Sequence, residues 1–223
     1  MKCQLITPLG KDYPDNLSSI TKPPALLYVK GALIPQDKNA VGIIGTRNPS
    51  EYGKRVARLF TSELSSAGIT IVSGLARGID TIVHTEALRS GGRTIAVMGS
   101  GINRIYPMEN KALAEKIMKS GALVSEFPDE VAPLPKHFLL RNRIISGLSL
   151  AIIVVEGRKR SGTLSTANHA ANQSRDVFAV PGEITNPMSG APNYLISQGA
   201  TIALSPDDVL TQLLHYSLVN THQ

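Results

Sequence analysis

The sequence is poor in several features that would point to particular classes of protein. Its 223 residues include no Trp and only one Cys, Cys3, so no disulfide can form within the chain. No stretch reaches the roughly 18 apolar residues that a membrane span requires. The first residues, MKCQLITPLG, lack the apolar run of a secretory signal. We therefore expect a cytoplasmic protein with no membrane partner.

Motifs that mark several enzyme classes are missing as well. The sequence contains neither the P-loop string G-x-x-x-x-G-K-[ST] nor the G-x-S-x-G elbow of α/β-hydrolases. The first glycine-rich turn, GIIGTRN, does not follow the dinucleotide-binding fingerprint, and the lone G-x-G at Gly99 and Gly101 is weak support for one. The five histidines are scattered without the spacing of metal ligands. We predict no metal site and no bound cofactor.

What is present favours a core of aliphatic residues and an anionic partner. Apolar residues make up 42% of the chain, and because aromatics are few, the core must consist mainly of Val, Ile, Leu and Ala. Such a core is typical of parallel sheets that are covered by helices on both faces. Lys and Arg exceed Asp and Glu by 23 to 17, which gives a net charge of +6. A modest positive charge is compatible with a nucleotide or nucleic acid as the partner.

From Val41 onward the chain repeats a short β-branched run, a glycine-rich turn and an amphipathic segment. The strand starts are roughly 25 to 30 residues apart, which is the length of a βα unit. Near-continuous apolar runs such as AIIVV indicate strands that are buried on both faces. We therefore predict an α/β fold, a doubly wound and mostly parallel sheet with helices on both faces. The predicted strands are 41–45, 70–74, 94–99, 122–126, 151–156, 176–182 and 201–204.

The chain is expected to form one Rossmann-like domain over residues 41–212. Residues 1–40 are punctuated by prolines, which predicts an extended lead-in that packs on this domain and contains one strand at 26–30. Residues 213–223 are expected to form a tail.

Five successive strands are each followed by a loop that carries at least one cation. In an open parallel sheet, ligands bind beyond the carboxyl ends of the strands, so these loops should meet at one edge. Glycines allow close backbone approach, helix N-termini present free N–H groups, and arginines bind phosphate through two nitrogens. The predicted phosphate-binding residues of the first three loops are Arg47, Gly74, Arg77, Gly78, Gly101 and Arg104. Those of the last two loops are Lys136, Phe138, Arg141, Arg143, Arg158, Lys159, Ser161, Gly162 and Thr163.

The segment 127–143 is the longest stretch between strands for which we expect no regular structure, which suggests a functional loop. It places Phe138 close to Lys136, Arg141 and Arg143. An aromatic ring among cations suits an unpaired base and its phosphates, although Phe138 could equally well pack in the core at a helix start. The segment is therefore compatible with single-stranded DNA as the ligand, and the choice of that ligand depends chiefly on the resemblance described next.

The same residues carry a resemblance to a known family. The strings GTRNPSEYG, SGLARGID, TIAVMGSGINRIYPMEN, FLLRNRIISGLS and VVEGRKRSGTLSTANHA resemble the Rossmann-type core of the DprA/Smf family of DNA-processing proteins. The similarity is collinear from about Tyr13 to Leu210. Leu139 stands where the family's FPxRNR block has proline. Many members also carry an N-terminal helical domain and a C-terminal winged helix, and neither is evident in this sequence.

The resemblance implies a non-catalytic protein that binds and protects single-stranded DNA and loads the RecA recombinase during natural transformation. It also implies a homodimer. Arg47 matches the basic residue of the family's G-[ST]-R turn. Lys136, Phe138, Arg141 and Arg143 lie in the segment that supplies the base-contacting aromatic and phosphate-contacting cations. Arg158, Lys159, Ser161 and Thr163 match the loop that ends in SGTL.

Two other functions remain open from the sequence. GRKRSGTLSTA is distantly similar to the PGGxGTxxE loop of LOG-like nucleoside-monophosphate phosphoribohydrolases, but Ser165 and Thr166 stand where the catalytic glutamate would be needed. Glu156, the last residue of the predicted strand 151–156, is more simply a buried helix cap or a partner for an arginine. The other alternative is a sensor of the same fold that binds a nucleotide without turnover.

Overall fold

The computed structural model describes residues 2–220, with side chains described for residues 2–214. Within that range the strands form one sheet in the order β1-β2-β6-β5-β4-β3-β7-β8-β9. All neighbours from β6 to β9 are parallel, whereas β2 pairs antiparallel with β1 and with β6. The predicted α/β fold is confirmed. The strands are β1 Gln4–Ile6, β2 Leu27–Gly31, β3 Ala40–Ile44, β4 Thr70–Ser73, β5 Thr94–Val97, β6 Ala122–Ser125, β7 Ala151–Val154, β8 Asp176–Ala179 and β9 Thr201–Ile202.

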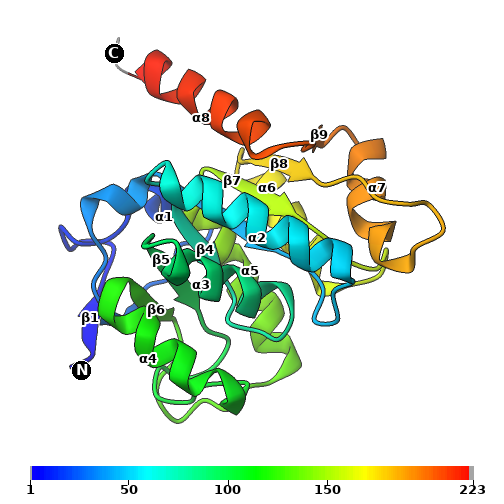
Figure 1. Ribbon diagram of the computed structural model, residues 1–223. Helices are drawn as coiled ribbons and strands as arrows, with labels where there is room; N and C mark the ends of the chain where they lie inside the picture. Colours follow the sequence, from blue (N-terminus) through cyan, green and yellow to red (C-terminus); the bar gives the residue numbers. More distant parts are fainter. Residues whose placement is uncertain (1, 221–223) are drawn as a thin grey trace.

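Helices cover both faces of the sheet (Figure 1). Successive strand residues point to opposite faces, so Ile43 packs in one apolar cluster with α2, α3 and α8. Its neighbour Ile44 packs in the other cluster, with α1, α5, α6 and α7. Among the described residues, no helix is long and apolar enough to cross a membrane. The helices are α1 Asp15–Ser18, α2 Glu51–Ser66, α3 Ile79–Arg89, α4 Lys111–Ser120, α5 Pro135–Leu148, α6 Gly162–Asn172, α7 Gly190–Ser197 and α8 Pro206–Asn220, with 3-10 turns η1 Pro35–Lys38, η2 Met108–Asn110 and η3 Pro187–Ser189.

The first 40 residues lie against the edge of the parallel sheet and one of its helices. The predicted strand at 26–30 is found one residue later, as β2, and it extends the sheet by pairing with β6. The short strand β1 was not predicted. Leu17 and Ile20 are buried, and their side chains lie within 3.1 Å of where a Cβ on Gly147 of α5 would sit. A small residue at that position therefore lets this segment pack closely on α5.

The C-terminal helix passes the boundary expected at residue 212. Helix α8 continues to Asn220, and Leu213 is buried in the cluster that contains α2 and α3. Residues 221–223 of the expected tail lie outside the described residues. The division of the chain into 1–40, 41–212 and 213–223 stays a prediction.

The interpretation of residues 127–143 as an irregular loop holds for 127–134 and was wrong for 135–143. Helix α5 begins at Pro135, so Lys136, Phe138, Arg141 and Arg143 are helical residues. Pro135 occupies the first helical turn, where its missing N–H costs nothing and its fixed φ favours the helix. The run of prolines before the helix concealed this start. As a result, the spacing of these side chains is set by the helical repeat, and they point in different directions.

Candidate nucleic-acid interface

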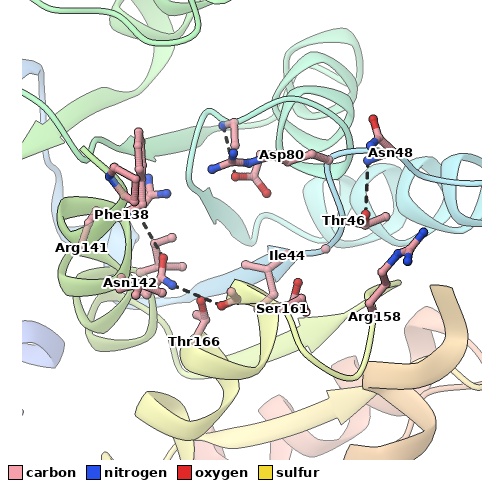
Figure 2. Close-up of a pocket in the computed structure, with 18 of the residues that line it drawn as sticks. Ile44, Thr46, Asn48, Asp80, Phe138, Arg141, Asn142, Arg158, Ser161 and Thr166 are labelled. Atoms are coloured by element: carbon pink, nitrogen blue, oxygen red, sulfur yellow. Dashed lines mark hydrogen bonds between the residues drawn. The ribbon is translucent and has the colours of Figure 1, made fainter. Parts of the chain in front are cut away.

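A cavity of about 720 Å³ opens at the carboxyl ends of the parallel strands. Its wall is formed by the loop after β3, the start of α3, the loop after β5, the first turns of α5 and the loop between β7 and α6. Figure 2 shows Phe138 and Arg141 on one side of it, Arg158 on the other, and Asp80 above Ile44 between them. The lining contains four arginines, Arg47, Arg141, Arg158 and Arg160, but only one carboxylate, that of Asp80. This excess of positive charge favours an anionic ligand.

The predicted residues divide into two groups around this cavity. Seven of them line it, and the others lie elsewhere on the same edge of the sheet or beneath it. The lining group is Arg47, Phe138, Arg141, Arg158, Ser161, Gly162 and Thr163. The residues outside the lining are Gly74, Arg77, Gly78, Gly101, Arg104, Lys136, Arg143 and Lys159.

Phe138 is half-buried, and its ring is held between charged and aromatic neighbours. The guanidinium carbon of Arg47 lies 5.6 Å from the ring centroid, and that of Arg141 lies 5.9 Å from it. The ring of Tyr106 is tilted against Phe138, with the two centroids 5.7 Å apart. Both distances to arginine are within the range of a cation–π contact. The ring therefore faces the cavity as a fixed surface rather than packing in the core.

Arg141 is buried and supports the cavity from below. Its Nη1 donates 2.7 Å to the carbonyl of Gly74 and also donates to the carbonyl of Val97, which joins the ends of β4 and β5. Burial lowers the pKa of Arg141 to about 10, although the charge of Asp80 acts in the opposite direction. Burial likewise raises the pKa of Asp80 above its usual range, against the stabilising charge of Arg141. The two groups flank Gly74, where a Cβ would lie 2.6 Å from each of them.

Arg143 points away from the cavity. Its Nη2 pairs with Glu126 at the end of β6, and both side chains are largely buried. Helical spacing explains this, because residues two apart lie on different sides of a helix. Arg143 thus ties α5 to the sheet, and its geometry does not offer it to a ligand in the cavity.

Arg77 and Arg104 are exposed, but both are occupied by contacts within the protein. Arg77 donates to both carboxylate oxygens of Glu109, at 2.7 and 2.8 Å. The Nε of Arg104 donates 2.8 Å to the carbonyl of Asp129. Gly78 and Gly101 each let two backbone segments pack closely. A Cβ at Gly78 would lie 2.3 Å from the carbonyl oxygen of Thr46, and a Cβ at Gly101 would lie 2.5 Å from that of Pro128.

The remaining cations are available to a ligand. Within the described part of the chain, no carboxylate pairs with Arg47, Lys136, Arg158, Lys159 or Arg160, and all five are exposed. Ser161 stands at the N-cap of α6 but makes no capping bond, and its buried hydroxyl has no hydrogen-bond partner among the described residues. The first N–H groups of α6 are therefore uncapped by a side chain, and Gly162 and Thr163 place them at the cavity wall. A helix N-terminus of this kind binds phosphate oxygens.

Glu156 has the structural role that the sequence suggested for it. Its carboxylate is 1% exposed and accepts hydrogen bonds from the backbone N–H of Ser50, at 2.9 Å, and from the hydroxyl of Ser50, at 2.5 Å. Ser50 is the N-cap of α2. The glutamate at the end of β7 therefore fixes the start of α2 and the loop that carries Arg47.

Most of the lining residues, including Arg160, were not among the predicted site residues. Asp80, Tyr106, Asn142 and Thr166 reach the cavity from α3, from the loop after β5, from α5 and from α6. Tyr106 stands in a loop that the sequence placed at the correct edge, so an exposed aromatic there was a usable signal. Among the described residues, no group of three His, Cys, Asp or Glu side chains could hold a metal ion.

Comparison with known proteins identifies a family to which this chain is similar. Residues 4–214 match the family model of DNA recombination-mediator protein A. The DNA processing protein DprA of Bacillus subtilis is 48% identical over 205 residues, which are 92% of this chain and 69% of that protein.

Two solved structures of related proteins share the fold closely. DNA processing protein A from Streptococcus pneumoniae matches with a TM-score of 0.90 and 40% identity, over 95% of this chain and 74% of that one. The Helicobacter pylori protein, solved to describe its single-stranded DNA binding mode, matches with a TM-score of 0.86 and 28% identity, over 96% and 97% of the two chains.

Proposed function

This chain belongs to the DNA recombination-mediator protein A family of DNA-processing proteins, and on that premise we propose that its arginine-lined cavity binds single-stranded DNA. The observation that carries the proposal is the ring of Phe138, which faces the cavity between Arg47 and Tyr106. The single-stranded DNA binding described for the Helicobacter pylori relative supports it.

In this proposal the two sides of the cavity have different tasks. A base stacks on Phe138, with Tyr106 beside it, and the neighbouring phosphates contact Arg47 and Arg158. The uncapped start of α6 receives a phosphate through its N–H groups. Lys136, exposed in the first turn of α5, adds positive charge at the rim. Arg141 acts indirectly, because it is buried beneath Phe138 and its hydrogen bonds hold α5 against the sheet.

The geometry favours single strands over duplex DNA. A base must leave its stack to reach the face of Phe138, and an unpaired base does so at little cost. Stacking of one base on an aromatic side chain contributes about 1–3 kcal/mol. The described residues that line the cavity come from loops and the first turns of helices, whereas a recognition helix enters the major groove along an exposed face.

We further propose that the protein acts without turning over its ligand, protects incoming single strands and loads the RecA recombinase onto them during transformation. The description of the family as a recombination mediator supports this role. Glu156 lies outside the lining, and its carboxylate accepts hydrogen bonds from Ser50. Among the described residues that line the cavity, Asp80 alone carries a carboxylate. RecA loading is tested by the rate at which RecA hydrolyses ATP on DNA coated with single-strand binding protein, which this chain should increase.

A homodimer is the proposed assembly state. The edge strand β9 leaves Ile202 47% exposed, and Leu204, two residues further along the chain, is 76% exposed. Exposed apolar residues on an open sheet edge favour pairing with another chain. Sedimentation equilibrium should give twice the mass of one chain, and Leu204→Asp should shift the equilibrium toward the monomer.

Titration of oligo-dT at several salt concentrations, followed by fluorescence anisotropy, tests the binding proposal. Affinity should fall as salt rises, with a logarithmic slope of about −0.7 for each phosphate contacted. Arg47→Ala should weaken binding and reduce that slope by about one contact, as should Lys136→Ala, whereas Phe138→Ala should weaken binding with little change in slope.

Arg58→Ala is the matched control, because it removes the same charge from an exposed position on α2 outside the cavity lining. Its affinity and slope should equal those of the wild type. Binding that does not respond to salt, or a preference for duplex over single strands, would overturn the proposal.

A further inference from the structure

A second hollow lies beside the cavity, on the side of the β7–α6 loop. It has a volume of about 490 Å³ and is lined by Lys159, Arg160, Leu164 and Tyr194. Arg160 lines both the cavity and this hollow, so the two are adjacent along the loop. Tyr194 projects from α7 and is 36% exposed.

The hollow repeats the pairing of side chains found in the cavity. The Nζ of Lys159 lies 5.2 Å from the ring centroid of Tyr194, as the guanidinium of Arg47 lies 5.6 Å from that of Phe138. Within the described residues, neither Lys159 nor Arg160 pairs with a carboxylate. Each site thus combines an aromatic ring, half-buried for Phe138 and exposed for Tyr194, with a cation that pairs with no carboxylate among the described residues. This is the combination that single-strand binding requires.

Tyr194 is held in place relative to the loop by backbone contacts. The N–H of Gly157 donates 2.6 Å to the carbonyl of Met188, and the N–H of Ala191 donates 2.7 Å to the carbonyl of Gly157. The side chain of Asn193 adds two hydrogen bonds to the backbone of Gly182, at 2.9 and 3.2 Å. Helix α7 and the cation-bearing loop therefore form one unit, and the two aromatic sites have a fixed separation.

We propose that Tyr194, Lys159 and Arg160 form a second base-stacking subsite for the same DNA strand, an inference that rests on the proposed function. The strand leaves the cavity along Arg160, a later phosphate contacts Lys159, and a base stacks on Tyr194. A strand that is too short to span both sites fills only the cavity. A longer strand offers more positions at which the protein can bind, which alone raises the affinity. The affinity should rise with strand length by more than this statistical factor.

The test compares dT6 with dT20 in anisotropy titrations of the full chain at one low salt concentration. Tyr194→Ala should weaken dT20 binding by about fivefold or more and leave dT6 binding unchanged. Tyr194→Phe keeps the ring and should bind both as the wild type does. Lys159→Ala should also weaken only dT20 binding. Lys116→Ala, which removes a charge from α4 at the other end of the sheet, should affect neither (Figure 1).

Each other outcome overturns the subsite. If Tyr194→Ala weakens both lengths equally, the residue acts on the cavity or the fold. If it changes neither, the strand does not reach α7. If it changes only the mass seen in sedimentation, Tyr194 belongs to a contact between two copies of the chain. Phe138→Ala distinguishes the two proposals. If the cavity binds DNA, this variant should bind both dT6 and dT20 more weakly, whether or not the second subsite exists.

Discussion

Gly99 allows Phe138 to occupy its place at the cavity, so Gly99→Ala should disturb the site without touching any ligand. A Cβ added at Gly99 would lie 2.6 Å from Cδ1 of the Phe138 ring and 3.2 Å from its Cα. Carbon atoms in contact prefer about 3.5–4.0 Å, so the ring must move by about 1 Å. Gly99 is not in the left-handed region of the backbone, and alanine fits its conformation. The perturbation is therefore mainly a displacement of the ring.

The expected loss follows from the distances around the ring. Arg47 lies 5.6 Å from the ring centroid, and a cation–π contact fades beyond about 6 Å. A shift of about 1 Å away from Gly99 also changes the face presented to a base. Because stacking contributes about 1–3 kcal/mol, Gly99→Ala should weaken oligo-dT binding by roughly 5- to 100-fold. Overpacking should lower the free energy of unfolding by about 1–3 kcal/mol.

A double-mutant cycle separates this mechanism from general damage. Binding is measured by anisotropy for the wild type, Gly99→Ala, Phe138→Ala and the double variant, after urea titration has established that each is folded. Without the ring, the alanine at position 99 has little left to displace, so the double variant should bind as Phe138→Ala does. Losses that add in the double variant, or a Gly99→Ala variant that binds normally, would refute the reasoning.

Two further predictions concern stability. Burial, aided by the charge of Arg141, lowers the pKa of His84 from its usual 6.5 to about 3. The unfolded chain therefore takes up the proton first, and stability is lost as pH falls below about 6.5. In urea titrations the advantage of the wild type over His84→Gln should shrink by about 2 kcal/mol between pH 7 and pH 5, and an unchanged difference would contradict this. Glu156→Ala removes both acceptors of Ser50 and should lower the free energy of unfolding by about 1–2 kcal/mol. Release of free base from AMP or GMP that is lost in Glu156→Ala would instead indicate catalysis.

The sequence was sufficient for the sheet because its signals are local. Each parallel strand is a short apolar run closed by glycine or a polar residue, and all seven predicted after residue 40 are present as β3 to β9. The edge at which a ligand is expected to bind follows from parallel strands alone. The sequence pattern predicted neither the strand β1 nor the antiparallel pairing of β2 with β6. Both depend on contacts between segments that are far apart in the sequence.

The site was harder to predict from the sequence than the sheet, because the direction of each side chain depends on the helix that carries it. Arg141 and Arg143 stand close to Phe138 in sequence, yet one is buried below the ring and the other pairs with Glu126. If Pro135 is taken as the start of a helix, the helical repeat places the side chains of Arg141 and Arg143 on different sides of it. The ion pair of Arg77 with Glu109 joins residues 32 apart, and no local pattern announces it.

Photocrosslinking tests the central claim, that the cavity is where single-stranded DNA binds. Oligo-dT carrying 5-iododeoxyuridine is bound, irradiated and digested, and the modified peptide is identified by mass spectrometry. Adducts are expected on Phe138 or Tyr106, and they should decline on competition with unlabelled oligo-dT. Adducts confined to α4 or α8, with the peptide that contains Phe138 unmodified, would contradict it.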